Sequence, residues 1–148
     1  MYKHILVPTD GSKLSLGAAK SAAALAHKMG ARITSVYVMA PYMPPMETDA
    51  VAFYPSQSAK GYEREVRKSA DNALAKVKAV ADRSQVKCEL LAVSGSNPWA
   101  QIIDTGKKEK CDLIVMASHG RRGLEALLLG SETQKVLTHS KVPVLVCR

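Results

Sequence analysis

Two hydrophobic patterns alternate along the chain. Short, nearly continuous apolar runs, typical of buried strands, occur at 2–8, 32–39, 86–93, 111–117 and 142–147. Between them, apolar residues recur every three or four positions, as on one face of a helix, at about 14–29, 60–83, 99–110 and 131–139. This alternation predicts an α/β fold whose parallel sheet is covered by helices on both faces.

Residues 40–60 break the alternation. They contain four prolines and no regular period, which predicts a long irregular loop. The strand before the loop and the helix after it belong to one crossover unit, so the loop is not a domain linker. With 148 residues and 47% apolar content, we expect a single domain spanning 1–148.

Neither a membrane segment nor an oxidising compartment is indicated. The longest uncharged apolar stretches, such as 113–117, are far shorter than the ~18 residues of a membrane span. Residues 1–12 leave no room for a signal peptide and lack its cleavage site. Cys88, Cys111 and Cys147 make no ligand pair with a histidine. We therefore expect a cytoplasmic protein with core thiols, no metal site and no membrane partner.

The formal charge of +8 raises the question of nucleic acid, because a basic face attracts phosphate whatever its sequence. The basic residues of 60–83 are interleaved with acidic ones, as on a solvated helix face. Aromatic residues make up only 5% of the chain, and no RNA-binding motif or zinc-finger spacing occurs. We expect no nucleic-acid partner.

Small polar loops follow two of the expected strands. Residues 8–12 (PTDGS) come after the first strand, and residues 117–120 (ASHG) come at the end of the fourth. Parallel strands end at the same edge of a sheet, where ligands bind in folds of this kind. We expect the two loops to lie together.

The second loop ends at Gly130 and Ser131, where a helix is expected to begin. Ser131 and Gln134 match a capping box, and the N–H groups and partial positive charge of a helix N-terminus suit a phosphate. Glycines at 120, 123 and 130 allow close backbone approach, and Arg121 and Arg122 add positive charge. A Gly-Ser pair is equally common before a helix without any ligand. Spacing alone leaves both interpretations open.

Fast phosphoryl transfer is not expected. The loop lacks the lysine of a P-loop, and it is not a Rossmann G-x-G-x-x-G motif. No Ser-His-Asp or Cys-His pairing is evident around His119, which we interpret as a hydrogen-bonding loop residue. We assign no catalytic residue.

Six segments together resemble the universal stress protein family. They read YKHILVPTDGS, RITSVYVM, GSNPWAQI, CDLIVMASHG, LLLGSETQKVL and VPVLVCR, and the resemblance covers the chain apart from 40–60. It implies a flavodoxin-like or Rossmann-like five-stranded parallel sheet of order 3-2-1-4-5. It also implies a homodimer formed by pairing of the last strands, through Val142, Val144 and Val146.

Nucleotide-binding members of this family carry G-x2-G-x9-G-[S/T]. Gly120, Gly130 and Ser131 match, whereas Ala117 occupies the place of the first glycine. An alanine keeps its N–H, so the phosphate contact survives if its φ is negative.

The resemblance implies a nucleotide site in three parts. Its base and ribose end would be lined by Pro8, Thr9, Asp10 and Val38. Its wall would be formed by Met116, Ala117, Ser118 and His119. The residues around the phosphates would be Gly120, Arg121, Gly130, Ser131, Glu132 and Thr133.

These expectations define a dimeric stress-response protein that binds ATP, with or without Mg²⁺, as a regulatory ligand for an unknown protein partner. Two alternatives stay open. In one, Ala117 has closed the site and the protein is a ligand-free interaction module that works through its dimer surface or the proline-rich loop. In the other, it is a very slow ATPase that depends on His119.

Overall fold

A computed structural model describes residues 1–44, 58–120 and 129–148. Its strands are β1 (His4–Pro8), β2 (Arg32–Met39), β3 (Cys88–Ser94), β4 (Leu113–Ala117) and β5 (Val144–Cys147). Its helices are α1 (Lys13–Met29), α2 (Ala59–Arg83), α3 (Pro98–Lys108) and α4 (Ser131–His139). Most of the proline-rich segment predicted as a loop, residues 45–57, lies outside the described residues.

The strands form one parallel sheet of order β3-β2-β1-β4-β5, which confirms the predicted order. Ile5 of β1 pairs with Ile33 on one side and with Leu113 on the other, so the chain order reverses between β1 and β4. We call the edge where the strands end the carboxyl edge; it lies at Pro8, Met39, Ser94, Ala117 and Cys147. The opposite edge, where the strands begin, is called the amino edge.

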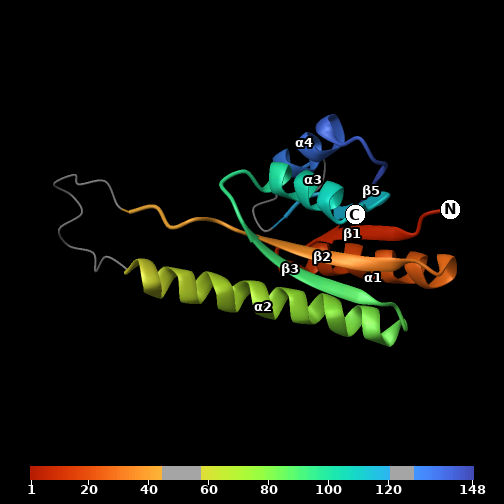
Figure 1. Ribbon diagram of the computed structural model, residues 1–148, viewed down its shortest axis with the longest axis horizontal. Helices are drawn as coiled ribbons and strands as arrows, with labels where there is room; N and C mark the ends of the chain where they lie inside the picture. Colours follow the sequence, from red (N-terminus) through yellow and green to blue (C-terminus); the bar gives the residue numbers. More distant parts are fainter. Residues whose placement is uncertain (45–57, 121–128) are drawn as a thin grey trace.

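Helices cover both faces of the sheet, as predicted. Figure 1 shows α1 and α2 on one face and α3 and α4 on the other. The first layer buries alanines of α1, such as Ala19 and Ala22, against Ile5 and Val7. The second buries Ile102 of α3 and Val136 of α4 against strand residues that include Leu6, Ile114 and Met116. Every residue of β4 is buried, because this strand is covered on both faces.

Several element boundaries differ from those predicted. Helix α3 ends at Lys108, not at Lys110, because Lys110 adopts a left-handed φ of 55° that the helix cannot continue through. Strand β5 begins at Val144, so Val142 of the expected dimer strand precedes it. Among the described residues, none of the helices has both the length and the apolarity needed to cross a bilayer.

Candidate functional site

The turn after β1 is held by hydrogen bonds within the carboxyl edge. Thr9 is buried, and its backbone N donates to the carbonyl of Val36 on β2 at 2.9 Å. Its Oγ1 lies 3.1 Å from Ser15 Oγ and accepts from the N–H of Gly11 at 3.2 Å. Thr9 therefore ties the turn to both β2 and α1.

Asp10 is part of the same turn but does not cap the helix. Its Oδ1 accepts from the N–H of Ser12 at 2.9 Å. Ser12 is the N-cap of α1, since its Oγ accepts from the N–H of Ser15 at 3.1 Å. The carboxylate of Asp10 is held at the start of α1 by this arrangement.

The loop after β4 is closed by backbone contacts at its two ends. The N–H of Ser118 donates to the carbonyl of Cys147 on β5 at 2.7 Å, and the N–H of Gly130 donates to the carbonyl of Ser118 at 2.8 Å. Thr133 Oγ1 donates to the carbonyl of Ala117 at 2.9 Å, so the first turn of α4 is attached to the end of β4. His119 Nδ1 lies 3.1 Å from Ser118 Oγ.

The two loops meet at Gly120, which confirms that they share the carboxyl edge, and the two ends of the second loop meet at Gly130. A Cβ atom added to Gly120 would lie 2.5 Å from Asp10 Oδ2. A Cβ atom added to Gly130 would lie 3.0 Å from the Cα of His119. A side chain at Gly120 would have to displace the Asp10 carboxylate, and one at Gly130 would require the backbone of His119 to shift slightly.

The other predicted site residues lie around this junction. Pro8 pairs with Val36, and Val38 follows two residues later at the end of β2, packed partly buried against the core beneath α3. Met116 is buried on the same face of β4. Arg121, predicted beside the phosphates, lies outside the described residues, as do Arg122 and Gly123.

Ala117 occupies an ordinary strand position. It is the last residue of β4, is 8% exposed, and pairs with Cys147 of β5. The only described non-glycine residues with positive φ are Gln85 and Lys110, so Ala117 has the negative φ that an alanine adopts without strain.

Helix α4 differs from the other helices at its N-terminus. Side chains accept hydrogen bonds from the first turns of α1, through Ser12, and of α2, through Ser58. In α3, Glu132 Oε2 accepts from the N–H of Trp99 at 2.8 Å. In the described part of the chain, the first turn of α4 has no such side-chain cap. No described side chain accepts from its first N–H groups, and its positive dipole end favours an anionic acceptor.

The predicted capping box is wrong. Gly130 is the N-cap of α4, with φ −59° and ψ 148°, and Ser131 is the first helical residue. The serine is thus one position too late for its hydroxyl to accept from the third N–H of the helix. The link from Glu132 to Trp99 was not predicted either, because no local pattern relates residues 33 positions apart.

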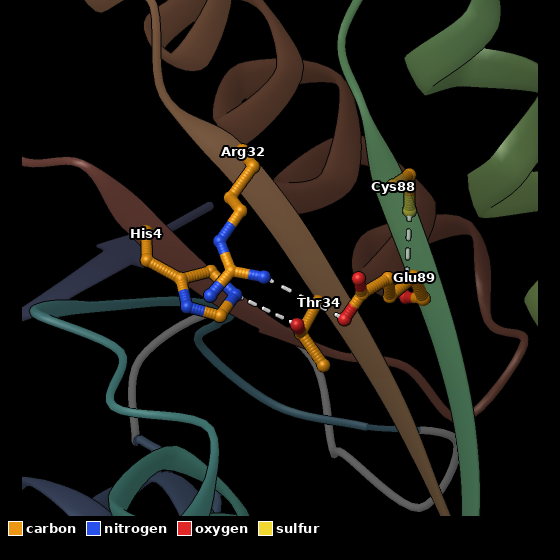
Figure 2. A network of polar contacts seen from close by, with 5 residues as sticks. All are labelled: His4, Arg32, Thr34, Cys88 and Glu89. Carbon is orange, nitrogen blue, oxygen red and sulfur yellow. Dashed lines mark hydrogen bonds and ion pairs between the residues drawn. The ribbon is translucent and has the colours of Figure 1, made fainter.

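A second polar cluster lies at the amino edge (Figure 2). His4 is 4% exposed, and its Nε2 lies 2.7 Å from Thr34 Oγ1, while Arg32 and Glu89 form an ion pair of 3.7 Å. Burial, followed by the charge of Arg32, lowers the pKa of His4 below 6.5. His4 is therefore neutral near pH 7.

The thiols and acidic groups offer no obvious metal ligands. Burial raises the pKa of Cys111 to about 12 and that of Cys88 to about 11, so both stay protonated. Cys111 is buried, as expected of a core thiol, while Cys88 and Cys147 are partly exposed. Within residues 1–44, 58–120 and 129–148, no three His, Cys, Asp or Glu side chains group closely enough to hold a metal ion.

Comparisons with known proteins agree on one family. The model of the Universal stress protein family matches residues 1–148. A universal stress protein of Methanocaldococcus jannaschii is 35% identical over 149 aligned residues, which cover 100% of this chain and 83% of that protein. The solved structure of the universal stress protein UspA from Lactobacillus plantarum has a TM-score of 0.78 at 26% identity, covering 99% of this chain and 98% of that one.

Two more distant structures with the same fold were solved with adenine nucleotides. One is a universal stress protein in complex with cAMP, with a TM-score of 0.72, 23% identity and coverage of 99% and 97% of the two chains. The other is the universal stress protein from Archaeoglobus fulgidus in complex with dAMP, with a TM-score of 0.65, 17% identity and coverage of 99% and 98%.

Proposed function

This chain belongs to the universal stress protein family, and from that premise we propose that it is a dimeric regulatory protein that binds ATP at the carboxyl edge of its sheet. Relatives in complex with cAMP and dAMP support an adenine nucleotide as the ligand class. The nucleotide state would report stress or energy status to a protein partner.

The observation that carries the proposal is the first turn of α4. Among the described residues it has no side-chain cap, and it begins at Gly130, whose backbone lies close to His119. Backbone N–H groups and the helix dipole at such an end stabilise phosphate. The phosphates of ATP would lie here, against Gly120, Gly130, Ser131 and Thr133.

The base and ribose would lie toward β1 and β2. Thr9 and Val38 are at the ends of these strands, beside the turn that holds Asp10. A carboxylate repels a polyphosphate but accepts hydrogen bonds from ribose hydroxyl groups. Asp10 is therefore assigned to the ribose and not to the phosphates.

The alanine in the motif is compatible with this site. Ala117 has no left-handed φ that would require glycine, and its carbonyl already accepts from Thr133. We infer that Ala117 forms part of the wall without closing it. Mg²⁺ would enter with the phosphates, since it commonly binds through substrate phosphates and retained waters.

We propose dimerisation through β5 because of the position and exposure of that strand. It is an edge strand of the sheet, and its Leu145 is 43% exposed. An apolar edge strand favours pairing with a second copy, which removes its unpaired backbone groups from water. Val144 and Val146 would lie in that interface.

Calorimetric titration of the nucleotide-stripped protein with ATP and Mg²⁺ tests the proposal. We expect one site per chain with a dissociation constant on the order of micromolar. A double variant, Gly130→Val with Ser131→Val, should abolish binding. Thr138→Val is the matched control, because Thr138 lies on the same helix and its hydroxyl donates to the carbonyl of Gln134 within that helix.

Three results would contradict the proposal, each in a different way. An absence of heat at several temperatures, confirmed by equilibrium dialysis, would mean that the protein acts through its surfaces as an interaction module. Unchanged affinity in the double valine variant would place the nucleotide elsewhere. Turnover of ATP that disappears only in His119→Ala would instead indicate an enzyme.

A further inference from the structure

Glu132 joins the N-terminal ends of two helices. It is the second residue of α4, yet its Oε2 accepts a hydrogen bond from the backbone N–H of Trp99 in α3 at 2.8 Å. The N-cap residue of α3, Asn97, makes no side-chain cap bond, and Pro98 has no N–H to donate. Glu132 thus supplies from another helix the carboxylate cap that α3 lacks.

This contact also determines where the negative charge of Glu132 lies. A carboxylate in the first turn of α4 would repel a phosphate bound at the same turn if it faced the ligand. Here it is directed to the N-terminus of α3, whose positive dipole end stabilises it. Its other oxygen lies 3.5 Å from Lys135 Nζ, which further offsets the charge.

Helix α4 is attached to α3 at its other end as well. The ring of Trp99 packs against the ring of His139, the last residue of α4, with centroids 4.9 Å apart. Trp99 therefore contacts the first turn of α4 through its backbone and the last turn through its side chain. Of these two contacts, only the one with Glu132 lies beside the uncapped N–H groups.

We propose that Glu132 is a positioning residue for phosphate: its bond to Trp99 fixes the first turn of α4 so that the N–H groups face the ligand. This inference rests on the proposed ATP site. It makes a hydrogen-bond acceptor at position 132, and not a negative charge, the requirement for tight binding.

Two substitutions separate the hydrogen bond from the charge. Glu132→Gln keeps an oxygen that accepts from Trp99 and removes the charge. Glu132→Ala removes both. We expect ATP to bind Glu132→Ala about tenfold more weakly than the wild type, and Glu132→Gln within about twofold of the wild type or more tightly. Glu63→Ala, on the exposed first turns of α2, is the matched control.

The measurements are calorimetric titration with ATP and Mg²⁺ and, without nucleotide, hydrogen exchange at the Trp99 amide. The amide should exchange faster in Glu132→Ala and return to the wild-type rate in Glu132→Gln. Far-UV circular dichroism of each variant verifies that it is folded. If Glu132 had only a structural role, Glu132→Ala would speed hydrogen exchange at the Trp99 amide and leave the ATP affinity unaltered.

The possible failures are distinguishable. Wild-type protein that binds no ATP overturns the proposed function and this inference with it. Wild-type binding with the same affinity in Glu132→Ala overturns this inference alone. Equally tighter binding in both variants would also overturn it, because it would mean that Glu132 acts on the phosphates only through its charge.

Discussion

Two histidines mark the opposite edges of the sheet. At the amino edge, His4 is buried on β1, and its Nε2 lies 2.7 Å from Thr34 Oγ1. At the carboxyl edge, His119 is partly exposed after β4, and its Nδ1 lies 3.1 Å from Ser118 Oγ. His4 pairs with a residue of the neighbouring strand, inside the sheet. His119 pairs with its neighbour in a loop and borders the close contact with Gly130. One histidine is buried within the sheet, and the other is partly exposed beside the proposed nucleotide site.

His4 Nδ1 is buried without a hydrogen-bond partner among the described residues, but a nearby carboxylate at this edge is paired within the protein. Asp112 accepts from the backbone N–H groups of Lys3 and His4, at 2.8 and 3.0 Å. Helices α1, α2 and α3 each lead into a strand that begins at this edge, and their last turns carry lysine or arginine; these residues are Lys28, Arg83, Lys107 and Lys108. Cations there stabilise the negative ends of the helix dipoles, which accounts for part of the net charge without any partner.

The carboxyl edge is organised in the opposite way. It collects helix N-termini, and of these the described part of the chain leaves α4 without a side-chain cap. Its two loops approach each other at Gly120, and the two ends of the second loop approach each other at Gly130. Polar groups that are satisfied internally indicate a structural role, and polar groups left available beside glycines indicate a binding site.

The largest effect should come from filling the carboxyl edge at Gly120. Its Cβ atom would lie 2.5 Å from Asp10 Oδ2, and Asp10 is held in place by Ser12. We expect Gly120→Val to weaken ATP binding by about a hundredfold, or about 2.7 kcal/mol, in calorimetric titration. Gly17→Val is the control, because nothing lies within 4 Å of its Cβ position. Equal losses of ATP affinity in both variants would contradict the placement of the ATP site beside Gly120.

At the amino edge, removing Asp112 should affect stability and not binding. The carboxylate bonds two backbone N–H groups, so Asp112→Ala should lower the free energy of unfolding by about 2 kcal/mol in denaturant titration, with ATP affinity unchanged. Asp104→Ala, which breaks only an exposed ion pair with Lys108, should cost less than about 0.5 kcal/mol. A loss of ATP affinity in Asp112→Ala would mean that the two edges are coupled.

A smaller, pH-dependent effect is expected from His4. Its pKa is lowered in the folded protein, so the unfolded chain takes up a proton first as the pH falls below about 6.5. The stability due to neutral His4 is thus complete above that pH and declines as the pH falls through the folded pKa. The free energy of unfolding, measured by denaturant titration at pH 7.5 and at pH 5.5, should differ less between the two pH values in His4→Gln than in the wild type. A difference in His4→Gln as large as that in the wild type would contradict this expectation.

The smallest expected effect is a gain in stability at the amino edge. Lys110 follows α3 with φ 55°, a conformation that glycine adopts without steric cost. Lys110→Gly should therefore raise the free energy of unfolding by roughly 0.5 kcal/mol, after the larger chain entropy of glycine is subtracted. Lys107→Gly, inside the helix, should lower it instead. A change of the same sign in the free energy of unfolding of both variants would contradict this expectation.

Much of the fold was predictable from hydrophobic periodicity. Continuous apolar runs such as 113–117 identified strands buried on both faces, and β4 is buried at every residue. The sheet order followed from the resemblance to a family, and the comparisons with known proteins support it. Helix ends were less predictable, because the left-handed φ at Lys110 has no signal in a sequence that contains no glycine or asparagine there.

The candidate site was predictable only in part. The spacing of Gly120, Gly130 and Ser131 identified the loop, but it placed the helix cap one residue late. The role of Ala117 depended on a backbone angle, and the partner of Glu132 lies 33 residues away. Neither property is encoded in a local pattern.

The sequence by itself determined which segments become strands and helices, because burying an apolar run or an apolar helix face is a local requirement on residue order. It also determined which residues follow the strands at the carboxyl edge. Only the tertiary structure decided that Asp10 lies against Gly120, that Glu132 caps α3, and that no described side chain caps α4. These contacts depend on distances between elements that are far apart in the chain and meet only when the sheet and its helices have packed.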